Sequence, residues 1–98
     1  MTQLIIQFRS ELDVTYGGGV FRSPSAKAIQ PINDILRSYA DAQVEPVFGG
    51  ETKDVPPHMR NYYQINLEDE NRARALERLL QQQTSLEAAY IKPPAELP

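Results

Sequence analysis

The chain has no cysteine and a single histidine, His58, among its 98 residues. Without cysteine it can form neither a disulfide framework nor a thiolate metal or redox site. One histidine builds no metal-binding cluster, and His58 follows Pro56 and Pro57 in a breaker-rich segment typical of a solvated loop. We therefore expect no catalytic activity, no bound metal and no cofactor.

Basic residues are also in short supply, since 10 Lys and Arg stand against 13 Asp and Glu, a formal net charge of −3. A nucleic-acid surface concentrates Lys and Arg on one face, so we expect no nucleic-acid partner. The apolar runs are far too short to span a bilayer, and the first residues lack the basic segment and cleavage site of a secretory signal. We expect no membrane partner, and a cytoplasmic location unless an upstream segment is missing.

What the chain does contain is regular hydrophobic periodicity. Alternation of apolar and polar residues predicts strands at residues 3–8, 44–48, 61–67 and 86–91. Spacings of three and four predict helices over 26–40 and 69–83; the second has Asp69 as its N-cap and an apolar stripe made of Ala73, Leu76, Leu79 and Leu80. Glu70 and Arg74 are spaced to pair on the outside of this helix.

Prolines and glycines modify this pattern. Pro31 lies inside the first helical stripe and predicts a loose first turn before it, because proline lacks an N–H and clashes with the preceding turn. Pro46 predicts that the second strand lies at a sheet edge or contains a bulge, because proline has no N–H for the strand ladder. Residues 10–25, which contain Gly17, Gly18 and Gly19, have the composition of a long loop.

The predicted order is β-α-β-β-α-β within a chain long enough for one domain. The most economical arrangement is an α+β, ferredoxin-like fold: a four-stranded antiparallel sheet with both helices on one face. Residues 1–91 would form this domain, and residues 92–98 an extended tail, since Pro93, Pro94 and Pro98 exclude a regular continuation.

The C-terminal part carries a family resemblance. Residues 86–91, Leu-Glu-Ala-Ala-Tyr-Ile, run into the proline-rich residues 92–98. This resembles the end of the N-terminal propeptide of subtilisin-like serine proteases, the peptidase inhibitor I9 type, where a hydrophobic-Glu-x-Ala-Tyr strand leads into a proline-rich linker. Such propeptides are known as β-α-β-β-α-β domains that act as intramolecular chaperones and temporary inhibitors in the protease zymogen. The resemblance implies docking by the open sheet face on the catalytic domain, in cis or in trans, with the tail lying in the substrate cleft.

Two groups of residues would bind the protease under this interpretation. Ile5 and Tyr62 would lie on the outer face of the sheet if Leu4 and Tyr63 point toward the helices. The segment that enters the cleft would contain Tyr90, Lys92, Pro93, Pro94, Ala95, Glu96, Leu97 and Pro98. Ala95 and Leu97 are the side chains expected to enter pockets of the protease.

The chain departs from the resembled family at two positions. Lys92 stands where the propeptides carry acidic residues that cap helices of the protease, so that contact is missing or falls to Glu51 and Asp54. Pro98 fits poorly before a scissile bond as the family is known, which favours a cleavage site further on or a free-standing inhibitor.

Two other functions stay open. Gly19-Val20-Phe21-Arg22 looks like the phosphate-binding loop of acylphosphatases, but it is one residue short, and the second strand lacks the asparagine that family needs. A small regulatory or ligand-binding domain that dimerises through its open sheet face or an edge strand has the same expected fold. Oligomeric state separates the regulatory dimer from the protease inhibitor.

Overall fold

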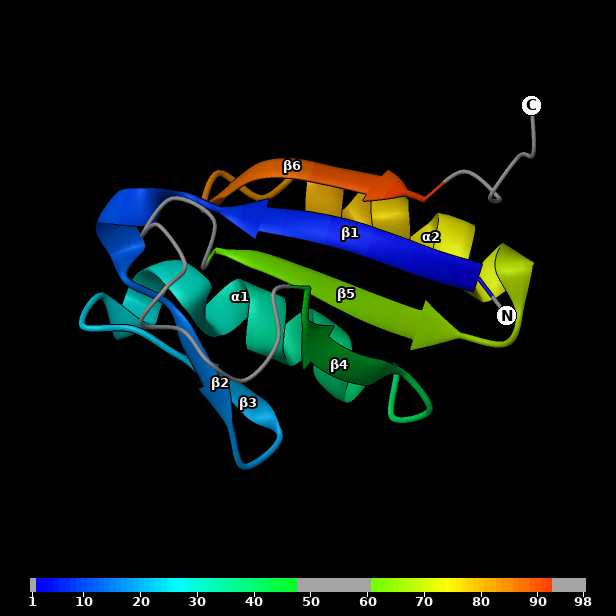
Figure 1. The fold of residues 1–98 in the computed structure, drawn as a ribbon, viewed down its shortest axis with the longest axis horizontal. Helices are drawn as coiled ribbons and strands as arrows, with labels where there is room; N and C mark the ends of the chain where they lie inside the picture. Colours follow the sequence, from blue (N-terminus) through cyan, green and yellow to red (C-terminus); the bar gives the residue numbers. More distant parts are fainter. Residues whose placement is uncertain (1, 48–60, 93–98) are drawn as a thin grey trace.

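The computed structural model describes residues 2–47 and 61–92 of the chain. Their elements follow the expected order, with a short 3-10 helix and a two-stranded hairpin added between the first strand and the first helix (Figure 1). In chain order they are β1 (Thr2–Phe8), the short 3-10 helix η1 (Ser10–Leu12), β2 (Thr15–Gly17), β3 (Val20–Arg22), α1 (Ala26–Arg37), β4 (Gln43–Pro46), β5 (Tyr62–Leu67), α2 (Glu70–Gln81) and β6 (Leu86–Ile91). No helix within these described ranges is both long and apolar enough to cross a bilayer.

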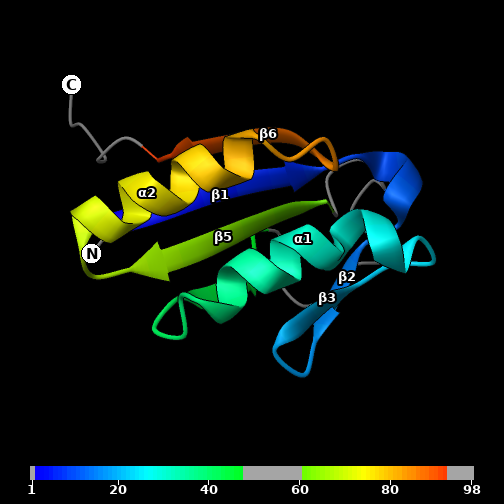
Figure 2. The same cartoon turned by 180° about the vertical axis from the view of Figure 1, so that it is seen from behind.

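The main sheet has four antiparallel strands in the order β4-β5-β1-β6. Both α1 and α2 cover the same side of this sheet, as the view from behind shows (Figure 2). The α+β class predicted from the sequence is thus confirmed, and the arrangement is compatible with a ferredoxin-like fold. The opposite side of the sheet carries no described helix (Figure 1).

The hydrophobic core fills the space between the sheet and the two helices. Leu4 and Ile6 of β1 face the helices and are fully buried, as is Ile65 of β5, which pairs with Leu4. Ile32 from α1 and Leu76 from α2 close the core from the other side. Burying each such side chain stabilises the fold by roughly 1.5–3 kcal/mol. Leu79 was predicted on the same stripe, but this was wrong: it is 40% exposed, one residue off the buried face.

Helix α1 begins at Ala26 and contains Pro31, so the expected loose first turn is also wrong. Proline removes one helical hydrogen bond, the one to the carbonyl of Lys27, a residue that is exposed. Ile29 and Ile32 on either side of the proline are buried against the sheet. Tertiary packing therefore holds the helix together across Pro31.

The predicted loop at residues 10–25 contains a β-hairpin instead. Strands β2 and β3 pair from Thr15 with Arg22 to Gly17 with Val20. Gly18 and Gly19 form its two-residue turn with φ of 63° and 83°, a conformation that side-chain-bearing residues rarely adopt. The hairpin is joined to the core by Phe21, which is 2% exposed and packs its ring 4.9 Å from that of Tyr63.

Candidate functional site: the outer face of the sheet

Alternate residues of the four strands point away from the helices, and we call the surface they form the outer face. The register brings them into rows across the sheet, one of which runs from Glu45 through Gln64 and Ile5 to Tyr90. The remaining members that pair in register are Gln3 and Gln7 of β1, Gln43 of β4, Tyr62 and Asn66 of β5, and Ala88 of β6. This face is rich in amide and tyrosine side chains, which suit a hydrogen-bonding protein contact better than an apolar core.

Ile5 lies on the outer face, as predicted, but it is not an exposed docking residue. Its side chain is only 7% exposed, because Gln64 and Tyr90 flank it on the two neighbouring strands. Tyr62, the other residue predicted for this face, is half-buried and pairs in register with Gln7. The large apolar surface that remains open on this face belongs to Tyr90, which is 44% exposed.

A polar network occupies the β4 side of the outer face. Oε1 of Glu45 accepts hydrogen bonds from Nε2 of Gln64 at 3.2 Å and from Nδ2 of Asn66 at 3.4 Å. The same Nε2 of Gln64 donates to Oδ1 of Asn66 at 2.9 Å. Sequence reasoning missed this cluster, because Glu45 meets the other two only through the pairing of β4 with β5.

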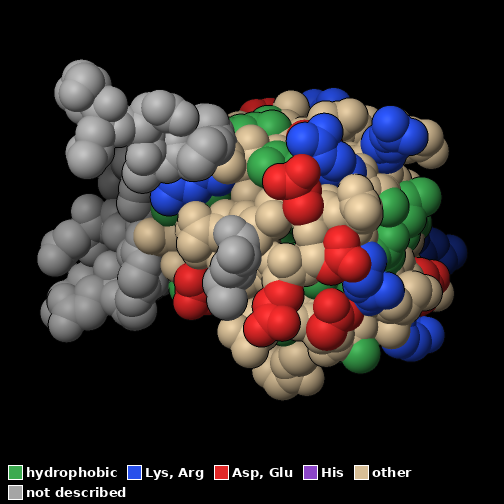
Figure 3. All heavy atoms as spheres, turned by 90° about the vertical axis from the view of Figure 1, so that its right-hand side faces the viewer, with side chains coloured by type: hydrophobic (Ala, Val, Ile, Leu, Met, Phe, Trp, Pro, Cys, Tyr) green, Lys and Arg blue, Asp and Glu red, His purple; other side chains and the backbone are tan. Residues whose placement is uncertain are grey.

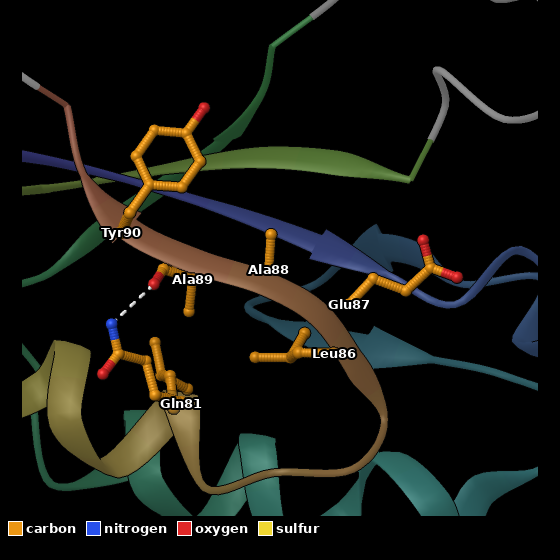
Figure 4. Close-up of a pocket in the computed structure, with 7 residues that line it drawn as sticks. Gln81, Leu86, Glu87, Ala88, Ala89 and Tyr90 are labelled. Carbon is orange, nitrogen blue, oxygen red and sulfur yellow. Dashed lines mark hydrogen bonds between the residues drawn. The ribbon is translucent and has the colours of Figure 1, made fainter.

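The outer edge of β6 is closed by side chains of α2. Ile91 donates its backbone N–H to Oε2 of Glu77 at 2.9 Å, and the carbonyl of Ala89 accepts from Nε2 of Gln81 at 3.0 Å (Figure 4). These backbone groups face away from β1 and would otherwise be free to pair with another strand. Figure 4 also shows Tyr90 on the opposite side of the strand from Gln81, so it points to the outer face.

A hollow of about 310 Å³ lies beside the same strand and is lined by the end of α2 and by residues 86–90. Leu86 and Ala89, which belong to its walls, are already buried in the core. The hollow therefore continues the seam between α2 and β6 and does not form a separate polar site.

The other edge strand, β4, is a poor template for strand addition. It is only four residues long and ends in Pro46, which has no N–H to donate. Beyond it, Val47 donates its N–H inward to the carbonyl of Tyr62 at 3.3 Å. With both edges restricted, the outer face is the better surface for a protein partner.

The end of the molecule where α2 begins carries acidic and basic side chains next to one another (Figure 3). Asp69 caps α2 by accepting hydrogen bonds from the N–H groups of Asn71 and Arg72, as the sequence predicted. Arg72 binds Asp41 at 2.6 Å, and the predicted pair of Glu70 and Arg74 forms at 3.3 Å. This region is a set of exposed ion pairs and has no single sign of charge.

The glycine segment considered for phosphate binding forms the turn of the hairpin. Phe21 donates its N–H to Oδ1 of Asn33 at 2.9 Å, and its carbonyl accepts from Nδ2 of the same residue at 3.0 Å. That N–H is therefore not free for a phosphoryl group. A second hollow of about 360 Å³ lies between this hairpin, the end of α1 and β4, and Tyr16 and Tyr39 contribute to its wall.

Of the predicted tail, the structure describes only Lys92. Its N–H donates to the carbonyl of Gln3 at 2.7 Å, which extends the pairing of β6 with β1 by one residue. Outside the described residues lie the other predicted tail contacts, Pro93, Pro94, Ala95, Glu96, Leu97 and Pro98, together with His58, Glu51 and Asp54.

Comparison of the chain with protein-family models, with curated proteins and with solved structures gave no match. Any function assigned to the chain therefore rests on its own residues and on the geometry of the outer face.

Proposed function

We propose that this chain is a propeptide-like inhibitor and intramolecular chaperone of a subtilisin-like serine protease, and that its fold is ferredoxin-like. The strand order β4-β5-β1-β6 supports the fold, because it places the first and third long strands side by side at the centre of the sheet, as in two interleaved βαβ halves. The chain docks by its outer face, and its C-terminal residues occupy the substrate cleft of the protease.

The observation that carries this proposal is the position of Tyr90. It is the most exposed large hydrophobic side chain of the outer face, and it lies on the strand that leads into the C-terminal segment. A tyrosine offers a broad apolar ring and a polar tip, and it loses little conformational entropy when it binds. A partner that covers the outer face around Tyr90 is therefore within reach of the residues after Lys92.

The sequence of residues 93–98 suits an extended ligand. Three prolines restrict the conformations of this segment, which lowers the entropy lost when a cleft holds it. Ala95 and Leu97 are the side chains we assign to pockets of the protease. Extended segments bind clefts mainly through backbone hydrogen bonds, with alternate side chains providing specificity.

The test is a titration of the purified chain into subtilisin-like serine proteases, with residual peptidase activity as the readout. We expect stoichiometric or slow-binding inhibition that is severely weakened by deletion of residues 93–98, while circular dichroism shows an unchanged fold. Tyr90→Ala should weaken inhibition about tenfold or more, as expected for a central tyrosine anchor. Leu79→Ala is the matched control, because Leu79 has a similar exposure of 40% but lies on the helical side.

No inhibition by the folded wild-type chain at high micromolar concentration would contradict the proposal. A stable dimer in sedimentation experiments on such a chain would then favour the small regulatory or ligand-binding domain. The closed edge of β6 already restricts one route to that dimer, because α2 occupies the backbone groups that a second strand would use.

A further inference from the structure

The carboxylate of Glu45 lies on the outer face and is fixed by hydrogen bonds from the neighbouring strand. Two amide groups of β5 donate to its Oε1, one from Gln64 and one from Asn66, and these two side chains also bind each other. Asn66 is buried, so one of the two donors has a restricted position. The carboxylate is thus oriented by the neighbouring strand, while Glu45 itself stays exposed.

The second oxygen of this carboxylate, Oε2, accepts no hydrogen bond from the part of the chain that the structure describes. Glu45 is also the one carboxylate among the outer-face residues that pair in register within residues 2–47 and 61–92. Lys92, which extends the pairing of β6 with β1, is a cation on the opposite edge strand, and the others are Gln, Asn, Tyr, Ile and Ala. A partner that covers this face would remove water from the carboxylate. Burial of an unpaired charge is strongly unfavourable.

We propose that Glu45 is the charged anchor of the outer face and that it pairs through Oε2 with a lysine or arginine side chain on the partner's surface. This inference rests on the proposed function and specifies the chemistry of the partner. A cation fits better than a neutral donor, because a charge-assisted hydrogen bond is the stronger one and compensates the lost hydration of the carboxylate. Gln64 and Asn66 act as positioning residues, since both donate to Oε1 and neither donates to Oε2.

The same geometry accounts for specificity. An acidic partner surface would face Glu45 without compensation, and like charges brought together at an interface oppose binding. The tyrosine side chains of the outer face supply contact area, whereas Glu45 requires a positive charge on the partner's surface opposite it. A protease whose docking surface carries Lys or Arg opposite β4 is therefore the expected target.

The experiment compares inhibition constants of wild type, Glu45→Gln, Glu45→Arg and Glu70→Gln against the same subtilisin-like protease at low and high salt. Glu70→Gln is the matched control, because it removes the same charge from α2 on the opposite side of the sheet. We expect about a tenfold weaker inhibition constant for Glu45→Gln and a larger loss for Glu45→Arg. Only chains with Glu45 should lose affinity steeply with salt.

If wild type inhibits the protease and Glu45→Gln has the same inhibition constant and the same salt dependence, Glu45 is not the charged anchor. The proposed function would then still stand. Equal losses in Glu45→Gln and Glu70→Gln would also overturn it, since net charge would then explain the effect. Absence of inhibition by the folded wild-type chain would overturn both proposals. Glu45 is exposed and glutamine has the same shape, so circular dichroism should report a native fold for this variant.

Discussion

Glu77 of α2 accepts the backbone N–H of Ile91 at 2.9 Å, so a helix side chain occupies an edge position of the sheet. Gln81, one turn further along the helix, donates its side-chain N–H to the carbonyl of Ala89 on the same edge. An exposed strand edge is a template for pairing with another chain, and proteins commonly cover or charge it. In this protein two outward backbone groups of that edge are occupied by side chains of α2.

The first prediction concerns this edge. The double variant Glu77→Ala, Gln81→Ala frees two outward backbone groups of β6 and should increase self-association. Sedimentation velocity over a concentration series should show a larger, concentration-dependent sedimentation coefficient than that of the wild type. Arg78→Ala is the control, because Arg78 is exposed on the same helix and makes no hydrogen bond to β6 among the described residues. Identical sedimentation of the double variant and wild type would show that the covered edge has no such effect.

The second prediction concerns the attachment of the hairpin. Asn33→Ala removes the partner of both backbone groups of Phe21, which is almost fully buried. The loss should be about 2–4 kcal/mol in the free energy of unfolding, because buried backbone groups without a partner are costly. Urea unfolding measures it. Asp34→Ala, next on the same helix, breaks only an exposed ion pair with Arg37 and should change stability by less than about 1 kcal/mol. A loss of similar size in both variants would argue against a specific role of Asn33.

The third prediction concerns the start of α2. Asp69→Ala removes the acceptor for the N–H groups of Asn71 and Arg72 and should lower the free energy of unfolding by about 1 kcal/mol. Thermal unfolding followed by circular dichroism is the measurement. Glu68→Ala is a control at the neighbouring exposed position, where no cap is lost. Equal melting temperatures for Asp69→Ala and wild type would contradict this view of the cap.

The fourth prediction concerns Tyr63 at high pH. Burial raises the pKa of its phenol above the ordinary value of 10.0, and the hydroxyl donates to the carbonyl of Val14 at 3.4 Å. The folded chain therefore holds this proton more tightly than the unfolded chain. Its contribution to stability is complete below pH 10.0 and is lost as the pH rises through the folded pKa. Urea midpoints should fall less steeply above this pH in Tyr63→Phe than in wild type, and parallel curves would contradict the prediction.

The sequence predicted the long elements well, because their signals are local. Alternation placed β1 and β5 within one residue of their observed ends, and Asp69 marked the start of α2. The hairpin was missed because its strands are three residues each, too short for a periodic signal. The pair Gly18-Gly19 between Thr15-Tyr16 and Val20-Phe21 was the available sign of a two-residue hairpin turn.

The candidate site was predicted only in part. Tyr62 and Tyr90 could be assigned to the sheet from alternation, yet the burial of Ile5 depends on the long side chains that the register places on both sides of it. No local sequence pattern identified Glu45 as part of the site. Its partners Gln64 and Asn66 are about twenty residues away in the chain and meet it only across two paired strands.

The sequence by itself determined the kinds and the order of the long elements, and which side of each strand of the main sheet faces the helices, because these follow from periods of two and of 3.6 residues along one segment. Only the tertiary structure decided which strands are neighbours and in which register they pair. Those choices place Glu45 against Gln64, Ile5 between Gln64 and Tyr90, and Glu77 against Ile91. They depend on contacts between distant segments that form together when the core is buried, and no single stretch of the chain encodes them.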